Sequence, residues 1–537
     1  MSRQRVVVTT LVAVVAFLSG GWLMQQGGEP AQGVYQQARM FDDVLSHIAD
    51  YYVDSLDERQ LYRMAIDGML RELHDPYTGY LDGRDLRTLT EATSGNYGGV
   101  GLQIEYRDGA IVVVVPLADS PAERAGMLTG DRIIQVDDSV TARWNQERAV
   151  SSLRGPAGTT VTLKVERPGV TGALTYRLTR AQIHARSVRL ATLVGDGVGY
   201  VELYSFSEST ARELGAAIDS LRTAGMKALI LDLRWNPGGL LDEGVAVSDL
   251  FLDPGQAIVT TRGRAPGATR QIADRNPQRY AGLPIVVLVN GATASAAEIV
   301  AGALQDHDRA VIVGTTSYGK GLVQSVFPLS TTVSLKMTTS KWYTPNGRSI
   351  QRAFRQTEER DPDEEVARND STAAAQDTFK TDHGRTMRGG GGIAPDVVVR
   401  PDSAEIVARN RLQQALGNQN VVKYTDALAA FALDARARQT ISSPTFTVTP
   451  AIRSQFLDLL RQRGVTLDQA TVDATWPFME KQIGGQTARF AFGRAGEVLR
   501  QTTDDPVLST AKRLAARATS PASLLELASQ QAPAQHP

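Results

Sequence analysis

Cysteine is absent from the 537 residues of the sequence, which excludes disulfides, zinc–thiolate sites, iron–sulfur clusters and a cysteine nucleophile. Histidine is scarce: there are six, and no two have the His-x-x-x-His spacing of a metal site, so we expect neither a metal nor a cofactor. An excess of basic charge is also lacking, because 57 basic and 58 acidic residues leave a formal net charge of −1. This balance argues against nucleic acid as a partner.

Only one hydrophobic run is long enough to cross a bilayer, and it lies at the N-terminus. Arg3 and Arg5 precede residues 6–24, which carry no charge and have about the length that a membrane-spanning helix needs. Positive charges in front of the run favour insertion with the N-terminus in the cytoplasm. We therefore expect residues 1–30 to be an uncleaved signal anchor that holds the chain on the periplasmic side of the inner membrane. A cleaved signal peptide, which would leave an exported soluble protein, and a buried core helix are the alternatives.

The pattern of the remaining chain changes three times, which predicts a multidomain α/β protein. Residues 31–94 carry apolar side chains at three- and four-residue spacing, which predicts a helical domain. In residues 95–182, short β-rich runs alternate with turns, which predicts a compact β module. Residues 401–537 look helical again, with a turn at 442–450. The helical regions at the two ends are candidate surfaces for a homodimer.

Strands and helices alternate through the largest region, residues 183–400, which predicts an α/β core with a mostly parallel sheet. Its polar, charged stretch at 356–392 is expected to be a mobile insertion. Ligands of such sheets bind beyond the carboxyl ends of the strands. That rule directs attention to three turns, at 234–239, 290–295 and 314–321.

The first two turns carry residues suited to acyl transfer. Gly238 and Gly239 let the backbone approach a substrate closely, although a tight turn between strand and helix explains them equally well. Ser295 lies at the start of a predicted helix, where its hydroxyl meets the positive end of the helix dipole, although N-cap serines are common. An oxyanion forming there would accept N–H bonds from Ala296 and from the Gly238–Gly239 turn.

A serine nucleophile needs a base, and the third turn offers one. His307 lies at the far end of the helix that Ser295 begins, about 18 Å away. Lys320 lies in a turn at a strand boundary, although a surface lysine is the ordinary interpretation. As a base it must be neutral, so its pKa must fall from about 10.4 to about 7–8, at a cost of about 4 kcal/mol. Gln324 can orient the amine without stabilising its charge. A phosphate-binding loop is excluded because Gly321 stands where Ser or Thr is required.

Three runs, at 232–239, 293–298 and 319–324, closely resemble those of the carboxyl-terminal processing peptidases, also called tail-specific proteases. These are serine peptidases with a Ser/Lys dyad. The resemblance extends from about residue 35 to about residue 400. It implies that Ser295 is the nucleophile, Lys320 the general base and Gln324 its orienting partner, and that the oxyanion hole comprises N–H groups of Gly238 or Gly239 and of Ala296. The chain departs from the family pattern at Trp235, which replaces a more typical polar residue, and at Ala297, where the family usually has Ser.

Residues 97–181 resemble the PDZ domain of the same family. The run Tyr97-Gly-Gly-Val-Gly-Leu102 matches a loop that cradles a terminal carboxylate. A peptide C-terminus would add as a strand beside residues 102–105. The resemblance implies that the peptide-binding residues are Gly98, Gly99, Val100, Gly101, Leu102, Gln103 and Ile104. It also implies that Arg154 couples this domain to the active site. The alternative is a β module that binds nothing.

We therefore expect a serine endopeptidase that captures polypeptides by their accessible C-termini and cleaves them through an acyl-enzyme, without a cofactor. Two alternatives remain open. One is a non-catalytic PDZ adaptor or chaperone. The other is a Ser-His ester hydrolase with His307 or His184 as base.

Overall fold

The computed structural model describes residues 31–107, 110–167, 170–352, 377–400 and 402–531. The chain divides into two compact units, one of residues 1–82 with 326–338 and the other of residues 83–325 with 339–537. The predicted signal anchor, residues 1–30, lies outside the described residues. Within the described ranges, no helix combines the length and the apolar composition needed to cross a membrane.

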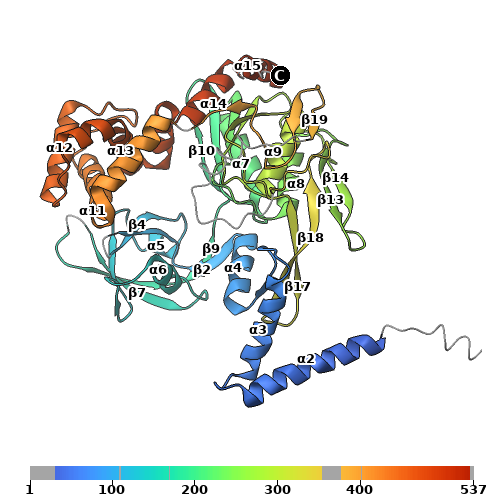
Figure 1. The fold of residues 1–537 in the computed structure, drawn as a ribbon. Coiled ribbons are helices and arrows are strands. Elements are labelled where there is room, and N and C mark those ends of the chain that lie inside the picture. Colours follow the sequence, from blue (N-terminus) through green and yellow to red (C-terminus); the bar gives the residue numbers. More distant parts are fainter. Residues whose placement is uncertain (1–30, 108–109, 168–169, 353–376, 401, 532–537) are drawn as a thin grey trace, which may run out of the picture. The chain divides into compact units, whose positions relative to one another are not determined.

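The first unit contains the N-terminal helices (Figure 1). They are α2 (Ala31–Tyr51) and α3 (Glu58–Arg71), and Asp57 caps α3 by accepting the Arg59 N–H. A short strand that the sequence analysis did not predict, β1 (Gly79–Leu81), pairs antiparallel with the beginning of β18 (Ser334–Tyr343).

The β module of residues 95–182 contains a six-stranded sheet and two short helices. Its sheet has the order β3-β4-β5-β7-β8, with β6 on β5, so that β3 is an edge strand. The strands are β3 (Leu102–Arg107), β4 (Ala110–Pro116), β5 (Arg132–Val136), β6 (Ser139–Val140), β7 (Thr160–Glu166) and β8 (Leu174–Thr179), and the helices are α5 (Pro121–Arg124) and α6 (Gln146–Leu153). Helix α4 (Gly83–Ser94) precedes the module, and β2 (Asn96–Gly99) and β9 (Ala181–His184) pair at its two ends.

The α/β core is built on a six-stranded sheet of order β10-β11-β12-β15-β16-β21. Its strands are β10 (Val188–Leu193), β11 (Val198–Leu203), β12 (Ala228–Asp232), β15 (Ile285–Val289), β16 (Val311–Gly314) and β21 (Val397–Val398). The pair β10–β11 is antiparallel and the other four pairs are parallel. The prediction of a mostly parallel sheet is therefore right for this sheet.

The prediction covers only part of the α/β core, because this core also contains antiparallel strands, and most strand pairings in the described residues are antiparallel. The core has a second, antiparallel sheet in which β13 (Ala257–Gly263) pairs with both β14 (Arg270–Ala273) and β18, and β17 (Leu322–Pro328) pairs with β18. The sequence analysis missed β13 and β14 because neither is a continuous apolar run.

The predicted mobile insertion, 356–392, is also wrong in part. Residues 353–376 lie outside the described ranges, but β19 (Thr378–Lys380) and β20 (Thr386–Arg388) form a hairpin. Beside that hairpin, the Arg385 guanidinium forms ion pairs with Asp308 and Asp396, whose side chains are buried. Arg385, one of the charged residues of this stretch, thus has buried partners in the core.

Helices cover both faces of the parallel sheet, which explains why β12 is apolar from Ala228 to Leu231, before it ends at Asp232. Leu229 and Leu231 face one hydrophobic cluster, and Ala228 and Ile230 face another. The first cluster contains residues of α7 (Thr210–Thr223), α8 (Leu241–Asp249) and α9 (Ala296–Asp306), and the second contains residues of α14 (Pro506–Arg517) and α15 (Pro521–Ser529). Figure 1 shows α14 and α15 in red at the C-terminal end of the chain.

The remaining C-terminal helices have a hydrophobic cluster of their own, which includes Leu412, Phe456 and Met479. They are α11 (Ser403–Ala437), α12 (Pro450–Gln462) and α13 (Gln469–Asp504). The predicted turn before Pro450 is present between α11 and α12. The sequence analysis expected helices in residues 401–537, but it did not predict that α14 and α15 would pack against the parallel sheet and complete the core.

Candidate active site

The turn after β12 lies directly against the turn that carries Ser295. Gly238 has a φ of 90°, and a Cβ atom there would lie 2.8 Å from both the Ser295 Cβ and the Ala296 nitrogen. The Ala294 N–H donates to the Asn236 carbonyl at 2.9 Å, which joins the two turns. Only glycine at position 238 permits this approach.

The N–H groups predicted to form the oxyanion hole differ in their surroundings. The Gly238 N–H donates to the Asn236 Oδ1 at 2.8 Å, so it already has a partner in this conformation. Gly239, with a φ of 149°, forms a bridge with Phe206, whose carbonyl accepts the N–H of Leu240. Ala296 begins α9.

Ser295 has a backbone conformation that few residues other than glycine adopt. Its φ is 57° and its ψ is −117°, whereas an ordinary N-cap residue is extended. Holding a residue in such a region costs about 1–3 kcal/mol and is characteristic of functional sites. Ser295 also starts a helix directly after a strand and a sharp turn. A serine that only capped the helix would not need this strain.

The Glu298 carboxylate joins Ser295 to the third predicted turn. Its Oε2 accepts the N–H of Ser295 at 2.8 Å and the N–H of Lys320 at 2.9 Å. Its Oε1 accepts the Gly319 N–H at 2.7 Å and the Ser317 hydroxyl at 2.5 Å. Because the N–H groups of Ser295 and Lys320 donate to the same oxygen, their two nitrogens can be no farther apart than the sum of the two hydrogen-bond lengths.

Burial raises the pKa of Glu298, which is 0% exposed, while its four hydrogen bonds act in the opposite direction. The sequence analysis quoted Glu298 as part of a motif but gave it no role. The signal was present, since a Ser followed by a Glu three residues later at the start of a helix predicts a capping box. In this structure the same carboxylate also holds the loop that carries Lys320.

Lys320 and Gln324 lie at and just after the boundary between this loop and β17, and both are half-buried. The indole N–H of Trp342 donates to the Lys320 carbonyl at 3.0 Å. The N–H of Tyr318 donates to the Thr293 carbonyl at 2.9 Å, which gives the loop a second connection to the turn before Ser295.

The two histidines considered as alternative bases make other contacts. His307 caps the C-terminal end of α9, and its two ring nitrogens lie 2.7 Å from the Asp382 carboxylate and 2.7 Å from the Ala257 carbonyl. The Nε2 of His184 is 2.6 Å from the Glu213 carboxylate. Neither contact involves the predicted nucleophile. Among the described residues, no three histidine, aspartate or glutamate side chains are grouped as a metal site would require.

The predicted peptide-binding residues occupy three neighbouring places in the β module. Gly98 and Gly99 lie in β2, where a Cβ at Gly98 would be 2.2 Å from the Gly155 carbonyl oxygen. Val100 and Gly101 form the loop before β3, and the Val100 carbonyl accepts an N–H from the start of α5. The remaining three, Leu102, Gln103 and Ile104, begin the edge strand β3.

Arg154 lies at the C-terminal end of α6 and reaches out of the module. Its Nη1 is 2.6 Å from the Glu91 carboxylate of α4, and its guanidinium carbon is 4.6 Å from the centre of the Tyr97 ring. Arg154 therefore contacts β2 at the start of the module and α4, which precedes the module in the chain.

Three known families match the sequence. Peptidase family S41 matches residues 197–366, a PDZ domain matches residues 112–167, and the activating protease CtpB N-terminal domain matches residues 23–84. The first match contains all three predicted catalytic turns.

Curated proteins and solved structures show similar chains. The carboxy-terminal-processing protease of Bartonella bacilliformis is 41% identical over 60% of this chain and 74% of that protein. The carboxy-terminal processing protease CtpA of Bacillus subtilis is 38% identical over 56% of this chain and 64% of that protein. The structure of the photosystem II D1 C-terminal processing protease matches with a TM-score of 0.37 and 28% identity, over 67% of this chain and 87% of that chain.

Proposed function

Because this chain belongs to the family of carboxy-terminal processing proteases and is a serine-type peptidase with a PDZ domain, we propose that Ser295 and Lys320 are its catalytic pair. The observation that carries the proposal is the buried Glu298 carboxylate, which accepts the N–H of both residues on one oxygen. The strained backbone of Ser295 supports it independently.

The reaction then runs through an ester of Ser295. Neutral Lys320, oriented by Gln324, takes the hydroxyl proton as the Ser295 Oγ bonds to the scissile carbonyl carbon and the carbonyl oxygen becomes negative. The Lys320 ammonium returns the proton to the amine as the C–N bond breaks. Water then attacks the ester carbonyl carbon as Lys320 takes its proton. The Lys320 ammonium returns that proton to the Ser295 Oγ as the bond between Oγ and the acyl carbon breaks, which releases the carboxylic acid product and restores the free enzyme.

The oxyanion of the tetrahedral intermediate needs N–H donors, and we assign this role to Ala296 and Gly239. Gly238 instead supplies the space for the close approach of the two turns, because its own N–H is bound to Asn236. Each such donor contributes about 3–4 kcal/mol to stabilisation of the transition state.

Substrate selection belongs to the PDZ domain. Because β3 lies at the edge of its sheet, an extended peptide can add beside it as a further strand, and the loop before β3 would hold the terminal carboxylate in its N–H groups. Polypeptides with accessible C-termini are the substrates that this arrangement fits. Arg154 would then link peptide capture to the residues that precede the domain.

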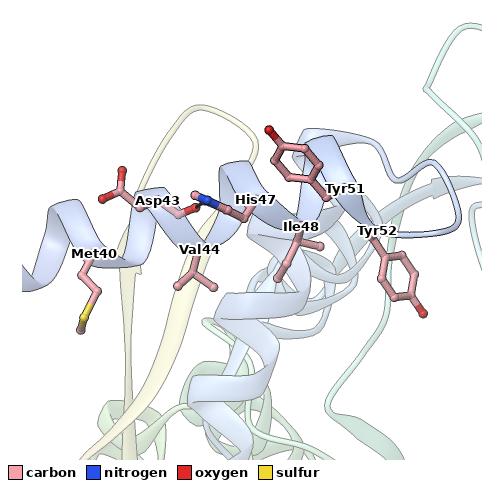
Figure 2. A pocket seen from close by; sticks show the side chains of 7 residues that line it. All are labelled: Met40, Asp43, Val44, His47, Ile48, Tyr51 and Tyr52. Carbon is pink, nitrogen blue, oxygen red and sulfur yellow. Dashed lines mark hydrogen bonds between the residues drawn. The ribbon is translucent and has the colours of Figure 1, made fainter.

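We also propose that the chain is anchored by residues 1–30 on the periplasmic side of the inner membrane, on the evidence of its N-terminal sequence. Homodimerisation is supported by the apolar face of α2. Figure 2 shows Met40, Val44 and Ile48 projecting from one side of this helix, and these side chains line a pocket together with those of Tyr51 and Tyr52. The Met40 and Tyr51 side chains are 63% and 79% exposed, and clustered apolar exposure of this kind is typical of an interface.

The catalytic proposal is tested by digesting an unstructured peptide with wild type, Ser295→Ala and Lys320→Ala and recording the product masses. We expect internal cleavage by wild type alone, and slower cleavage when the peptide C-terminus is amidated. Wild-type turnover by Ser295→Ala, or by Lys320→Ala, would refute the assignment. Loss of activity in His307→Ala combined with full activity in Lys320→Ala would favour the ester-hydrolase alternative instead.

A further inference from the structure

Arg234 begins the turn of the active site, and two carboxylates far apart in the sequence hold its guanidinium. Its Nε and Nη2 lie 3.0 Å and 2.7 Å from the two oxygens of Asp232, and its Nη1 lies 2.5 Å from the Asp505 Oδ2. The side chains are 16% exposed for Arg234, 5% for Asp232 and 21% for Asp505. Charge-assisted bonds of this fork geometry fix orientation as well as adding stability.

These charges are too deeply placed to be an ordinary surface ion pair. Burial alone would lower the pKa of Arg234, but the charges of Asp232 and Asp505 outweigh it and hold the pKa well above its usual value. The Tyr200 hydroxyl donates to Asp232 at 2.8 Å, which completes the buried cluster. Loss of one carboxylate would leave the guanidinium only partly compensated.

Asp505 is itself held firmly in place. It is the N-cap of α14, and its Oδ1 accepts the N–H groups of Val507 at 2.9 Å and Leu508 at 3.3 Å. Its other oxygen, Oδ2, is the one that binds Arg234. Leu508 and Leu514 of α14 are buried against the parallel sheet, which fixes the position of this helix. Asp505 at its start is therefore fixed as well, and it holds the Arg234 guanidinium in place.

The residues that follow Arg234 lead directly to Ser295. The Trp235 N–H donates to the Asn290 Oδ1 at 3.1 Å, and the next residue, Asn236, accepts the Ala294 N–H at 2.9 Å. A shift of Arg234 would therefore move a turn that packs against the nucleophile.

We propose that Asp505 is a positioning residue of the peptidase site, and that the C-terminal helices thereby complete it. Asp505 holds Arg234, and Arg234 holds the start of the 235–239 turn. This turn packs against Ser295 through Gly238 and carries Gly239, one of the two proposed oxyanion donors. This inference rests on the proposed catalytic role of Ser295. It assigns a function to a helix that lies beyond the S41 match, which ends at residue 366.

Asp505 has a second role, the capping of α14, and the test must separate the two. Asparagine caps helices as well as aspartate does, so Asp505→Asn keeps the cap while removing the negative charge that faces Arg234. Asp505→Ser also keeps a capping group, and it serves as a second variant should Asp505→Asn fold poorly. The control is Lys512→Met, which breaks the 3.3 Å contact of α14 with Asp196 at the opposite end of the strands.

The experiment compares the full-length wild type, Asp505→Asn, Asp505→Ser, Lys512→Met and Ser295→Ala. The measurements are kcat and KM on an unstructured peptide, the rate at which a fluorophosphonate probe phosphonylates Ser295 with loss of fluoride, and the thermal midpoint. We expect Asp505→Asn and Asp505→Ser to lower kcat and the phosphonylation rate at least tenfold, because displacement of reacting groups by about 1 Å costs about a hundredfold. In the two Asp505 variants, KM should change less than threefold, and the thermal midpoint should fall no more than it does in Lys512→Met. The control Lys512→Met should keep the kcat of wild type.

A kcat within twofold of wild type in the two Asp505 variants, with Ser295→Ala inactive, would overturn this inference and leave the catalytic proposal intact. A loss of kcat that only follows a loss of thermal stability would also overturn it, because capping alone would explain that result. Full activity of Ser295→Ala would overturn both proposals together.

Discussion

Two regions of the protease core bury a carboxylate, and their surroundings differ sharply. At the start of α9, Glu298 is 0% exposed and accepts four hydrogen bonds from backbone and hydroxyl donors. Where the end of α8 approaches β14, Asp274 is 3% exposed, and its Oδ2 receives no hydrogen bond from a described residue. The neighbour of Asp274 is a second carboxylate, Asp249.

The pKa values follow these surroundings. Burial raises the pKa of both groups, but four donors oppose the rise at Glu298. At Asp274, burial and then the hydrogen bond to Asp249 raise the pKa to about 7. Burying a carboxylate is costly unless donors replace the lost water. The difference teaches that hydrogen-bond donors compensate Glu298 as a structural link between catalytic residues, whereas Asp274 keeps its proton up to about pH 7.

The largest effect is expected from Glu298→Gln. The amide has one acceptor oxygen in place of two and presents N–H groups toward the N–H donors of Gly319 or Lys320, so the loop must move. We expect kcat/KM on a peptide to fall at least a hundredfold. Activity within threefold of wild type would show that the carboxylate does not position the catalytic pair.

In contrast to Glu298→Gln, which should impair the protein, Asp274→Asn is expected to stabilise it. The substitution removes a negative charge that the folded state disfavours. The raised pKa means that the folded protein binds more protons than the unfolded chain between about pH 4 and pH 7, so stability falls as the pH rises through that window. At pH 8 the variant should therefore unfold with a free energy about 1–3 kcal/mol higher than that of wild type.

At pH 5, where Asp274 is protonated in the folded state, the two proteins should differ much less. Urea denaturation at both pH values measures this difference, and Asp249→Asn provides a matched control on the partner carboxyl. An equal difference at pH 5 and pH 8 would show that the titration of Asp274 is not the cause.

Ser317→Ala removes one of the four donors to Glu298 and should have the smallest effect. We expect a loss of about 1 kcal/mol in unfolding free energy and a few-fold decrease in kcat. The control is Ser248→Ala, since Ser248 is equally buried but donates to the Gly244 carbonyl of α8. A decrease in kcat that is equal in the two variants would assign the effect to general loosening of the core.

The sequence predicted the helices of both termini, but it did not predict what covers them. Apolar spacing indicates that a helix has a face to bury, and α14 buries Leu508 and Leu514 against the sheet. The same kind of spacing in α2 leaves Val44 53% exposed. The partner of such a face lies elsewhere in the chain or in a second molecule, and no local pattern specifies it.

In the candidate site, the sequence predicted the three turns because each follows a strand of a parallel sheet and carries unusual residues. It did not predict the Glu298 link or the contact between Arg234 and Asp505. Both depend on side chains that the fold brings together from distant positions. The same is true of Gly238. A glycine at this position predicted a close approach of the backbone, but the sequence did not predict that the Gly238 N–H donates to Asn236.

The most direct test of the Ser295–Lys320 assignment is to trap the acyl-enzyme. Wild type and Lys320→Ala are mixed with an activated ester of a short peptide, quenched in acid within the first turnover, and analysed by intact-protein and peptide mass spectrometry. The assignment predicts one acyl group on Ser295 in wild type and at least a hundredfold slower labelling in Lys320→Ala. Labelling of another residue, or equal rates in the two proteins, would contradict it.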